Sequence, residues 1–204
     1  MTRALFFDIG NVLIRFDPRI ALRGLAASTH RPEEEMVELL KGWRLVPEYE
    51  CGRVSTIEFF DEICALLSLH PISMDDFREI WSGVFMQEML VSPEILRTLR
   101  KSYRLGLISN TNELHFGVIS EKFPVLSEFH DATLSFQVGA MKPAPEMFSQ
   151  AVRRAGCAPG ESLFIDDLEE NVQAARAFGI PSIRFQTQEQ LLAELLERGI
   201  RVNH

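Results

Sequence analysis

Short apolar runs separated by helical patterns constrain the fold of this chain more than any other feature of its sequence. Four runs have the length and composition of buried strands: Ala4–Phe7, Leu105–Ile108, Ser162–Ile165 and Pro181–Phe185. Helical patterns lie between the last three of these runs. Strands that alternate with helices in this way form a parallel sheet with helices on both faces. The sequence therefore predicts an α/β fold.

Polar residues directly follow three of the predicted strands. Asp8 follows the first run, Ser109 the second, and Asp166 with Asp167 the third. In open parallel sheets, ligands bind outside the carboxyl ends of the strands, where these residues would lie. We therefore expect them to share one site.

The residue types at this site suit phosphoryl transfer through an aspartate. Such a reaction needs a carboxylate nucleophile, a divalent cation and groups that bind the phosphoryl oxygens. Asp8 is the predicted nucleophile, and Asp8, Asp166 and Asp167 offer the hard oxygen ligands that Mg²⁺ prefers. Lys142 can neutralise both the nucleophile and the phosphoryl group. Each residue alone has an ordinary structural explanation, and it is their combination at strand ends that favours a catalytic site.

Phosphate binding is assigned to the segment that follows the second strand. The Ser109 hydroxyl and the amides after it can donate to phosphate oxygens, and Lys142 supplies the cation. Asn110 can position the phosphate or cap the next helix, because asparagine favours both kinds of position. The predicted phosphate-binding residues are therefore Ser109, Asn110 and Lys142.

The stretch 17–88 interrupts the alternation of strands and helices. It contains helical patterns and no strong strand, and Ser55 forms a capping box that begins a helix over 56–67. We expect a small helical cap inserted after the first strand, over the edge of the sheet. The predicted organisation is a catalytic core of residues 1–16 and 89–204, with 17–88 as the cap.

Composition and charge limit the partners and the compartment. The net charge of −8 argues against nucleic acid, whose phosphates require clustered Lys and Arg. The three cysteines fit neither a zinc site nor a disulfide framework, which favours a cytoplasmic location. No signal peptide and no apolar run of membrane-spanning length is evident. The expected partner is a small phosphorylated metabolite, with no nucleic acid or membrane, for a monomer or homodimer.

Four segments resemble the motifs of the haloacid dehalogenase superfamily, in the family's order. They are Phe7–Val12, Ile108–Asn110, Lys142–Pro143 and Phe164–Asp167. The resemblance spans Ala4 to about Phe185, and the insertion lies where that family places its helical C1 cap. It implies a Rossmann-like three-layer core, Mg²⁺ and an aspartyl-phosphate intermediate at Asp8. It also implies that Ser109 binds phosphate, that Lys142 is the orienting cation, and that the Gly10 carbonyl joins Asp8 and Asp166 as a metal ligand.

Gly10 departs from the family pattern. Most phosphatases of this family have a second aspartate two positions after the nucleophile, where it serves as general acid and base. A positioned proton donor of this kind contributes about 10²–10⁴-fold to the rate. Three explanations remain open. The leaving group could depart with little protonation, as from an anomeric or acyl phosphate, or another donor could act, such as Asp17, a cap residue or water. Alternatively, the reaction could need no acid, as in 2-haloacid dehalogenation. Asp17 precedes Pro18, a pattern typical of a helix N-cap.

The residue pattern Asp-x-Gly-Asn-Val that begins at Asp8 also resembles one branch of the family. This branch is the small sugar phosphatases, which include enzymes acting on glucose 1-phosphate. The predicted activity is Mg²⁺-dependent hydrolysis of a small phosphorylated metabolite, with sugar phosphates as first candidates. The alternatives are a 2-haloacid dehalogenase and a catalytically silenced binding module. Adjacent acids at Asp166 and Asp167 are best explained by a cation, which argues against the dehalogenase. A silenced site has no chemical reason to keep Asp8, Ser109 and Lys142.

Overall fold

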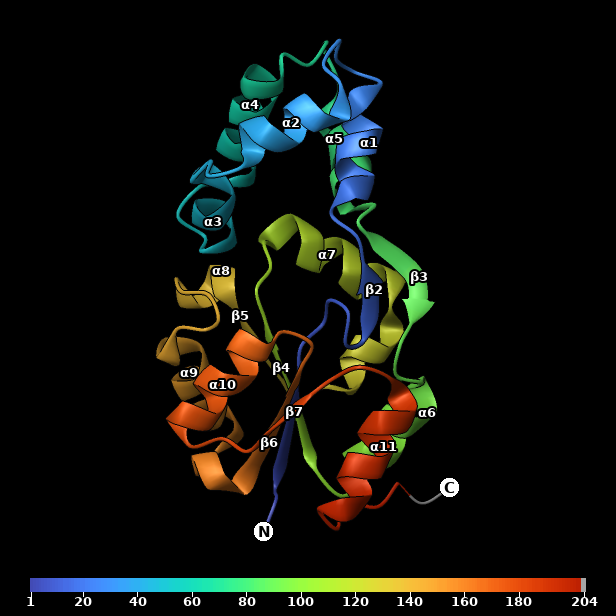
Figure 1. The fold of residues 1–204 in the computed structure, drawn as a ribbon, viewed down its shortest axis with the longest axis vertical. Coiled ribbons are helices and arrows are strands. Elements are labelled where there is room, and N and C mark those ends of the chain that lie inside the picture. Colours follow the sequence, from blue (N-terminus) through green and yellow to red (C-terminus); the bar gives the residue numbers. More distant parts are fainter. Residues whose placement is uncertain (203–204) are drawn as a thin grey trace.

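The computed structural model describes residues 1–202 and contains a parallel sheet at its centre (Figure 1). Its strands run in the order β5-β4-β1-β6-β7. Their bounds are β1 (Ala4–Phe7), β4 (Arg104–Ser109), β5 (Asp131–Leu134), β6 (Ser162–Asp166) and β7 (Ser182–Arg184). The neighbours in this sheet pair in parallel, which confirms the predicted α/β fold.

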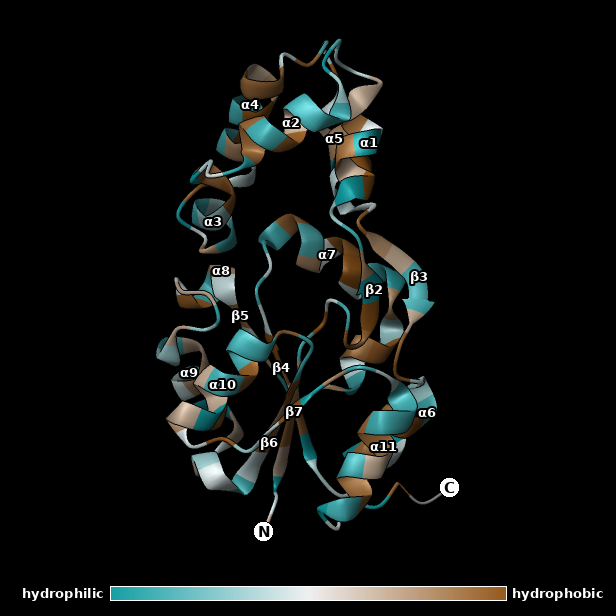
Figure 2. Cartoon of the chain, viewed as in Figure 1, coloured by the Kyte–Doolittle hydropathy of each residue, from teal (hydrophilic) through white to brown (hydrophobic). Residues whose placement is uncertain are grey.

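Helices cover both faces of the sheet. One face is covered by α6 (Pro93–Arg100), α7 (Glu113–Lys122) and α11 (Gln188–Glu197), and the other by α9 (Pro145–Ala155) and α10 (Glu169–Phe178). Because side chains alternate along a strand, Leu5 and Phe7 of β1 pack toward the first layer, and Ala4 and Phe6 toward the second. Hydrophobic residues are accordingly concentrated in the central strands (Figure 2).

A second group of helices lies beyond the carboxyl ends of the strands (Figure 1). It consists of α1 (Arg19–Ala26), α2 (Glu33–Leu40), α3 (Leu45–Glu50), α4 (Thr56–Leu67) and α5 (Met74–Ser82). These helices share a hydrophobic cluster of their own, in which Phe59 stacks on Tyr49 and packs edge-on against Trp81. The predicted capping box is present, with Ser55 and Glu58 each bonding the other's backbone amide. None of the helices within residues 1–202 is long and apolar enough to cross a membrane.

A two-stranded antiparallel sheet joins the inserted helices to the core. It pairs β2 (Ile14–Phe16) with β3 (Phe85–Met89), so the helices follow β2. The inserted helices also contact the core directly, α5 against α7 and α3 against the short helix α8 (Ser135–Val138). Short 3₁₀ turns, Pro124–Glu128 and Pro159–Glu161, precede β5 and β6.

The sequence did not predict β2, β3 or β5. The edge strand β5 has four residues, begins with Asp131, and has only two buried positions, so it lacks the apolar run that marks the other strands. Three central residues of β3 are exposed and give no period-two pattern. Short strands of this kind are held by their neighbours rather than by local propensity.

Candidate active site

The register of the central strands brings the predicted site residues together. Phe7 at the end of β1 is paired with Leu107 of β4 on one side and with Ile165 of β6 on the other. The Asp8 amide continues this ladder by donating to the Ile165 carbonyl at 3.0 Å. Asp8 therefore lies between the carboxyl ends of two neighbouring strands, from which Ser109 and Asp166 extend.

Lys142 connects the two buried acids of these strands. Its ammonium group lies 2.9 Å from Asp8 Oδ1 and 2.7 Å from Asp166 Oδ2, and its side chain is 2% exposed. The loop before α9 is held in place by Asn110, whose amide donates to the Lys142 carbonyl at 3.0 Å and accepts from the Lys142 amide at 2.7 Å. Asn110 thus lies at the site with its side chain bound to the main chain of Lys142.

Asp166 is fully buried and is oriented by several donors. The Leu168 amide donates to Oδ1 at 2.9 Å, and Asn171 Nδ2 lies 3.0 Å from Oδ1 and 3.2 Å from Oδ2. Asn171 belongs to α10 and is itself buried. Asn171 was not predicted as a site residue from the sequence. The available signal was its position five residues after Asp166, in the first turn of α10.

Three carboxylates could hold a metal ion. Asp8, Asp166 and Asp167 each offer one oxygen, and these atoms lie within 4.8 Å of one another. Within residues 1–202 the Gly10 carbonyl accepts no hydrogen bond, which leaves a further oxygen available beside Asp8. Carboxylate and carbonyl oxygens are the donor set that Mg²⁺ binds. The residues therefore fit the predicted cation.

The electrostatics reflect buried charges in close contact. Burial raises the pKa of Asp8 from 3.8 to about 6, with Lys142 lowering it and Asp166 raising it. Burial alone would lower the pKa of Lys142, but the two carboxylates outweigh it and the pKa is raised above its usual value. Burial and then Asp166 raise the pKa of Asp167. Lys142 is thus protonated. A further cation near the three acids would stabilise their charged forms.

A small pocket, the strand-end pocket, lies over these residues and has a volume of about 130 Å³. Its wall consists of Asp8, Ile9, Gly10, Asn11, Phe16, Glu50, Phe85, Ser109, Asn110, Thr111, His115 and Asp167. The Thr111 hydroxyl is buried and has no hydrogen-bond partner within residues 1–202. Thr111 and Glu50 belong to this wall and were not predicted as site residues from the sequence.

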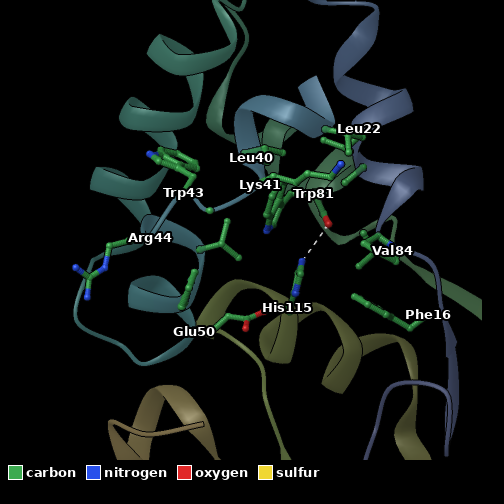
Figure 3. Close-up of a pocket in the computed structure, with 16 residues that line it drawn as sticks. Phe16, Leu22, Leu40, Lys41, Trp43, Arg44, Glu50, Trp81, Val84 and His115 are labelled. Carbon is green, nitrogen blue, oxygen red and sulfur yellow. Dashed lines mark hydrogen bonds between the residues drawn. The ribbon is translucent and has the colours of Figure 1, made fainter. Parts of the chain in front are cut away.

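A larger cavity of about 510 Å³, the apolar cavity, lies between the inserted helices and α7 (Figure 3). Most of its wall is apolar: Phe16, Pro18, Ala21, Leu22, Val37, Leu40, Trp43, Val46, Pro47, Trp81 and Val84. Lys41, Gly42, Arg44, Glu50 and His115 complete it. Phe16, Glu50 and His115 belong to both walls, so the two spaces adjoin.

His115 ties α7 to the inserted helices. Its Nε2 donates to the Trp81 carbonyl at 3.0 Å, and its Nδ1 accepts from Asn112 Nδ2 at 3.2 Å, because a carbonyl can only accept and an amide nitrogen only donate. Burial lowers the pKa of His115 to about 4. The imidazole is therefore neutral with its proton on Nε2.

Asp17 and Arg53 both have structural partners. Asp17 Oδ1 accepts from the Arg19 amide at 3.0 Å at the start of α1, and its other oxygen lies 3.3 Å from Arg23. Arg53 bonds Glu48 and donates to the Gly139 carbonyl at 3.0 Å. Asp17 therefore helps to begin a helix, and Arg53 connects the segment after α3 to the loop that carries Lys142.

A family model for haloacid dehalogenase-like hydrolases matches residues 2–179. The chain belongs to the haloacid dehalogenase-like hydrolases. Membership of this family confirms the predicted superfamily and the predicted enzyme class, a hydrolase. The matched segment includes the strand-end acids, Lys142 and the inserted helices.

Several members of the family resemble this hydrolase over nearly its whole length. The D-ribitol-5-phosphate phosphatase of Bacteroides thetaiotaomicron is 26% identical over 190 residues, which cover 90% of this chain and 92% of the relative. The structure of the HAD family enzyme BT-2542 from the same organism, in complex with magnesium and inorganic phosphate, has a TM-score of 0.80 and 25% identity, covering 92% of this chain and 96% of that one. A predicted HAD-like hydrolase from Porphyromonas gingivalis has a TM-score of 0.83 and 26% identity, covering 98% and 99% of the two chains.

Proposed function

We propose that this protein is a Mg²⁺-dependent phosphatase that hydrolyses a phosphate monoester of a small metabolite through an aspartyl-phosphate at Asp8. The observation that carries the proposal is the buried Lys142, which bridges Asp8 and Asp166 beside a third carboxylate. One lysine leaves three adjacent acids with excess negative charge, so a divalent cation suits the site. The BT-2542 structure with magnesium and phosphate supports this proposal.

In the first step, an Asp8 carboxylate oxygen forms a bond to phosphorus and the bond from phosphorus to the ester oxygen breaks. The departing oxygen takes up one proton and leaves as an alcohol. In the second step, water attacks the aspartyl-phosphate, loses a proton, and releases inorganic phosphate with the Asp8 carboxylate restored. Lys142 holds the Asp8 carboxylate in position and offsets its charge as a phosphate dianion approaches.

The remaining site residues have distinct proposed roles. Ser109 and the amides that follow it donate to phosphate oxygens, and Asn110 positions Lys142 through its main chain. Asp8, the Gly10 carbonyl, Asp166 and Asp167 would hold Mg²⁺. When bound there, the cation screens the repulsion between the nucleophile and the phosphate and stabilises charge on the phosphoryl oxygens.

We also propose that residues 17–88 act as a C1-type cap over the catalytic core. The hydrophobic cluster of the inserted helices and their place beyond the strand ends support this division. The organic group of the substrate would occupy the apolar cavity, next to the strand-end pocket that takes the phosphate. A cytoplasmic location and a monomeric or homodimeric state remain predictions of the sequence.

The substrate class has two sources of support that point in different directions. The relative named for D-ribitol 5-phosphate favours the sugar-phosphatase branch expected from the sequence. The wall of the apolar cavity offers sugar hydroxyls few hydrogen-bond partners, and it favours esters with an apolar group. Both classes therefore belong in the first substrate panel.

A panel of phosphate esters assayed with and without Mg²⁺ tests the proposal. It includes sugar phosphates, among them glucose 1-phosphate and ribitol 5-phosphate, together with aryl and branched alkyl phosphates. We expect Mg²⁺-dependent phosphate release by the wild type and none by Asp8→Asn, whose side chain has nearly the same shape. Phosphate release by folded Asp8→Asn would overturn the mechanism. Release of halide from 2-haloacids without metal would favour the dehalogenase alternative, and absence of any turnover would favour the silenced module.

A further inference from the structure

Glu50 lies in the wall of both the strand-end pocket and the apolar cavity. We propose that Glu50, on the inserted helix α3, protonates the leaving oxygen. It would replace the aspartate that most phosphatases of the family have at the position of Gly10, and the organic group would lie in the apolar cavity as it departs. This inference rests on the proposed phosphatase function. It concerns a residue outside the family motifs found in the sequence.

The strand-end pocket contains few groups that can transfer a proton. Within residues 1–202, its titratable wall residues are Asp8, Glu50, His115 and Asp167. Asp8 is the nucleophile, and Asp167 belongs to the acidic cluster. His115 is neutral, and both of its ring nitrogens are engaged by Trp81 and Asn112. Glu50 is the member of this set that remains available.

The position of Glu50 between the two spaces matches the position of the ester oxygen. The strand-end pocket, at about 130 Å³, is smaller than the adjoining apolar cavity, at about 510 Å³. In the proposed arrangement the phosphate lies in the strand-end pocket beside Asp8 and the organic group extends into the apolar cavity, which places the bridging oxygen near the residues that the two walls share. Of the three residues common to both walls, Phe16 has no proton to give and His115 is engaged, which leaves Glu50.

The surroundings of Glu50 favour a protonated carboxyl group. Within residues 1–202 no hydrogen-bond or ion-pair partner acts on its carboxyl group, and the side chain extends from α3 toward His115 (Figure 3). Burial raises the pKa of Glu50 to about 7, which places it near the value at which an acid can give and regain a proton. The charged and titratable groups that share a wall with it are Lys41, Arg44, His115, Asp8 and Asp167.

The proton balance needs no further reactant. Neutral Glu50 gives its proton to the ester oxygen as the bond to phosphorus breaks, and it is left as a carboxylate. The same carboxylate then accepts a proton from the water that attacks the aspartyl-phosphate. One turnover therefore returns Glu50 to its starting state, with the alcohol and phosphate as products.

The segment after α3 fixes Glu50 against the core. Gly52 has a φ of +67°, and a Cβ at this position would lie 2.2 Å from the Phe136 carbonyl oxygen of α8. Arg53 donates to the Gly139 carbonyl at 3.0 Å in the loop before Lys142. The helix that carries Glu50 therefore sits directly on the segment that carries the catalytic lysine. Asp17, by contrast, does not line the strand-end pocket.

The test measures kcat/KM against leaving-group pKa for the wild type, Glu50→Gln and a control, Glu113→Gln. Glu113 is an exposed carboxylate at the start of α7 and lies outside both walls. For alkyl phosphates, kcat/KM of Glu50→Gln should be about 10²–10⁴-fold lower than that of the wild type, because the alkoxide must leave unprotonated. For aryl phosphates with acidic leaving groups, kcat/KM should fall far less. The plot of log kcat/KM against leaving-group pKa should therefore be steeper for Glu50→Gln. The control should match the wild type.

A rescue variant provides a second measurement. A Cβ at Gly10 would meet Phe16 at 3.6 Å, an ordinary contact, so the backbone at this position has space for the first carbon of an aspartate side chain. In the double variant Gly10→Asp/Glu50→Gln, we expect partial recovery on alkyl phosphates. We also expect Glu50→Gln to lose the wild-type decline in kcat/KM as pH rises through about 7.

Two results would overturn the role of Glu50. One is a leaving-group slope and pH profile in Glu50→Gln that match the wild type. The other is an equal loss on every ester, which would assign Glu50 a structural role. Failure of the phosphatase function is a separate result, because it would show as turnover by Asp8→Asn or as no Mg²⁺-dependent turnover by the wild type.

Discussion

Replacing Asp8 with asparagine should abolish turnover and stabilise the metal-free protein. Burial raises the pKa of Asp8 from 3.8 to about 6, which means that folding disfavours its charged form. At about 1.36 kcal/mol per pKa unit, the difference corresponds to about 3 kcal/mol at pH 7. Asparagine removes the buried charge and leaves Lys142 paired with Asp166 at 2.7 Å. Because asparagine does not reproduce every contact of the carboxylate, we expect Asp8→Asn to raise the free energy of unfolding by about 1–3 kcal/mol at pH 7.

The assay is urea denaturation in the presence of a chelator, at several pH values. The folded wild type holds the Asp8 proton more tightly than the unfolded chain does, so lowering the pH from about 6 to 3.8 stabilises the wild type relative to the variant. The advantage of the variant should therefore be full above pH 6 and vanish near pH 4. Asp61→Asn, which changes an exposed carboxylate on α4, is the control and should change stability by less than about 0.5 kcal/mol.

Addition of Mg²⁺ should narrow or reverse the difference, because a cation that binds the folded state stabilises the protein with the stronger site. An Asp8→Asn protein that is less stable than the wild type at pH 7 without metal would refute the reasoning. It would mean that the ion pair with Lys142 outweighs the cost of burying the carboxylate. Equal effects of Mg²⁺ on both proteins would contradict the assignment of Asp8 as a metal ligand.

Three further predictions concern the cation, the lysine and the contact between α3 and α8. Chelation should abolish phosphate release and Ca²⁺ should inhibit it, since Ca²⁺ prefers a looser and higher coordination; an assay with full activity in chelator would count against the metal site. Lys142→Met should lose turnover and about 3–5 kcal/mol of stability without metal, because two buried carboxylates lose their cation; denaturation midpoints near the wild type would contradict this. Gly52→Ala should cost about 1–3 kcal/mol through its φ of +67° and its contact with the Phe136 carbonyl, and unchanged stability would show that α3 and α8 can separate freely.

The clustering of the candidate site residues could be predicted because three of them follow strands directly. Asp8, Ser109 and Asp166 each stand at the end of an apolar run, and parallel strands place such ends at one edge of a sheet. The order of the strands was not needed for this prediction, although β1 between β4 and β6 is what makes the cluster tight. Lys142 was found as part of the combination, while its bridging position between two acids depends on the loop before α9.

The residues that were missed depend on contacts between segments far apart in the chain. Asn171 orients Asp166, but asparagine on a helix face is too common to identify alone. The strand β5 has no apolar run and gains its pairing from β4, with an ion pair of 2.6 Å between Asp131 and Arg104 at its start. The sequence around such a residue or strand does not reveal its role, because the groups that contact it lie in other helices and strands.

Glu50 illustrates why a cap residue is harder to predict than a strand-end residue. In the sequence, Glu50 is one of several acids in a polar stretch, and its chemistry depends on where α3 packs. Gly52 and Arg53 place that helix on α8 and on the loop of Lys142, so the acid reaches a pocket whose other members come from the core. A donor on α3 depends on the packing of that helix against α8, whereas an aspartate at Gly10 would depend only on the end of β1. In the proposed mechanism, the same contact between α3 and α8 therefore places a wall of the strand-end pocket and the proton donor for the leaving group.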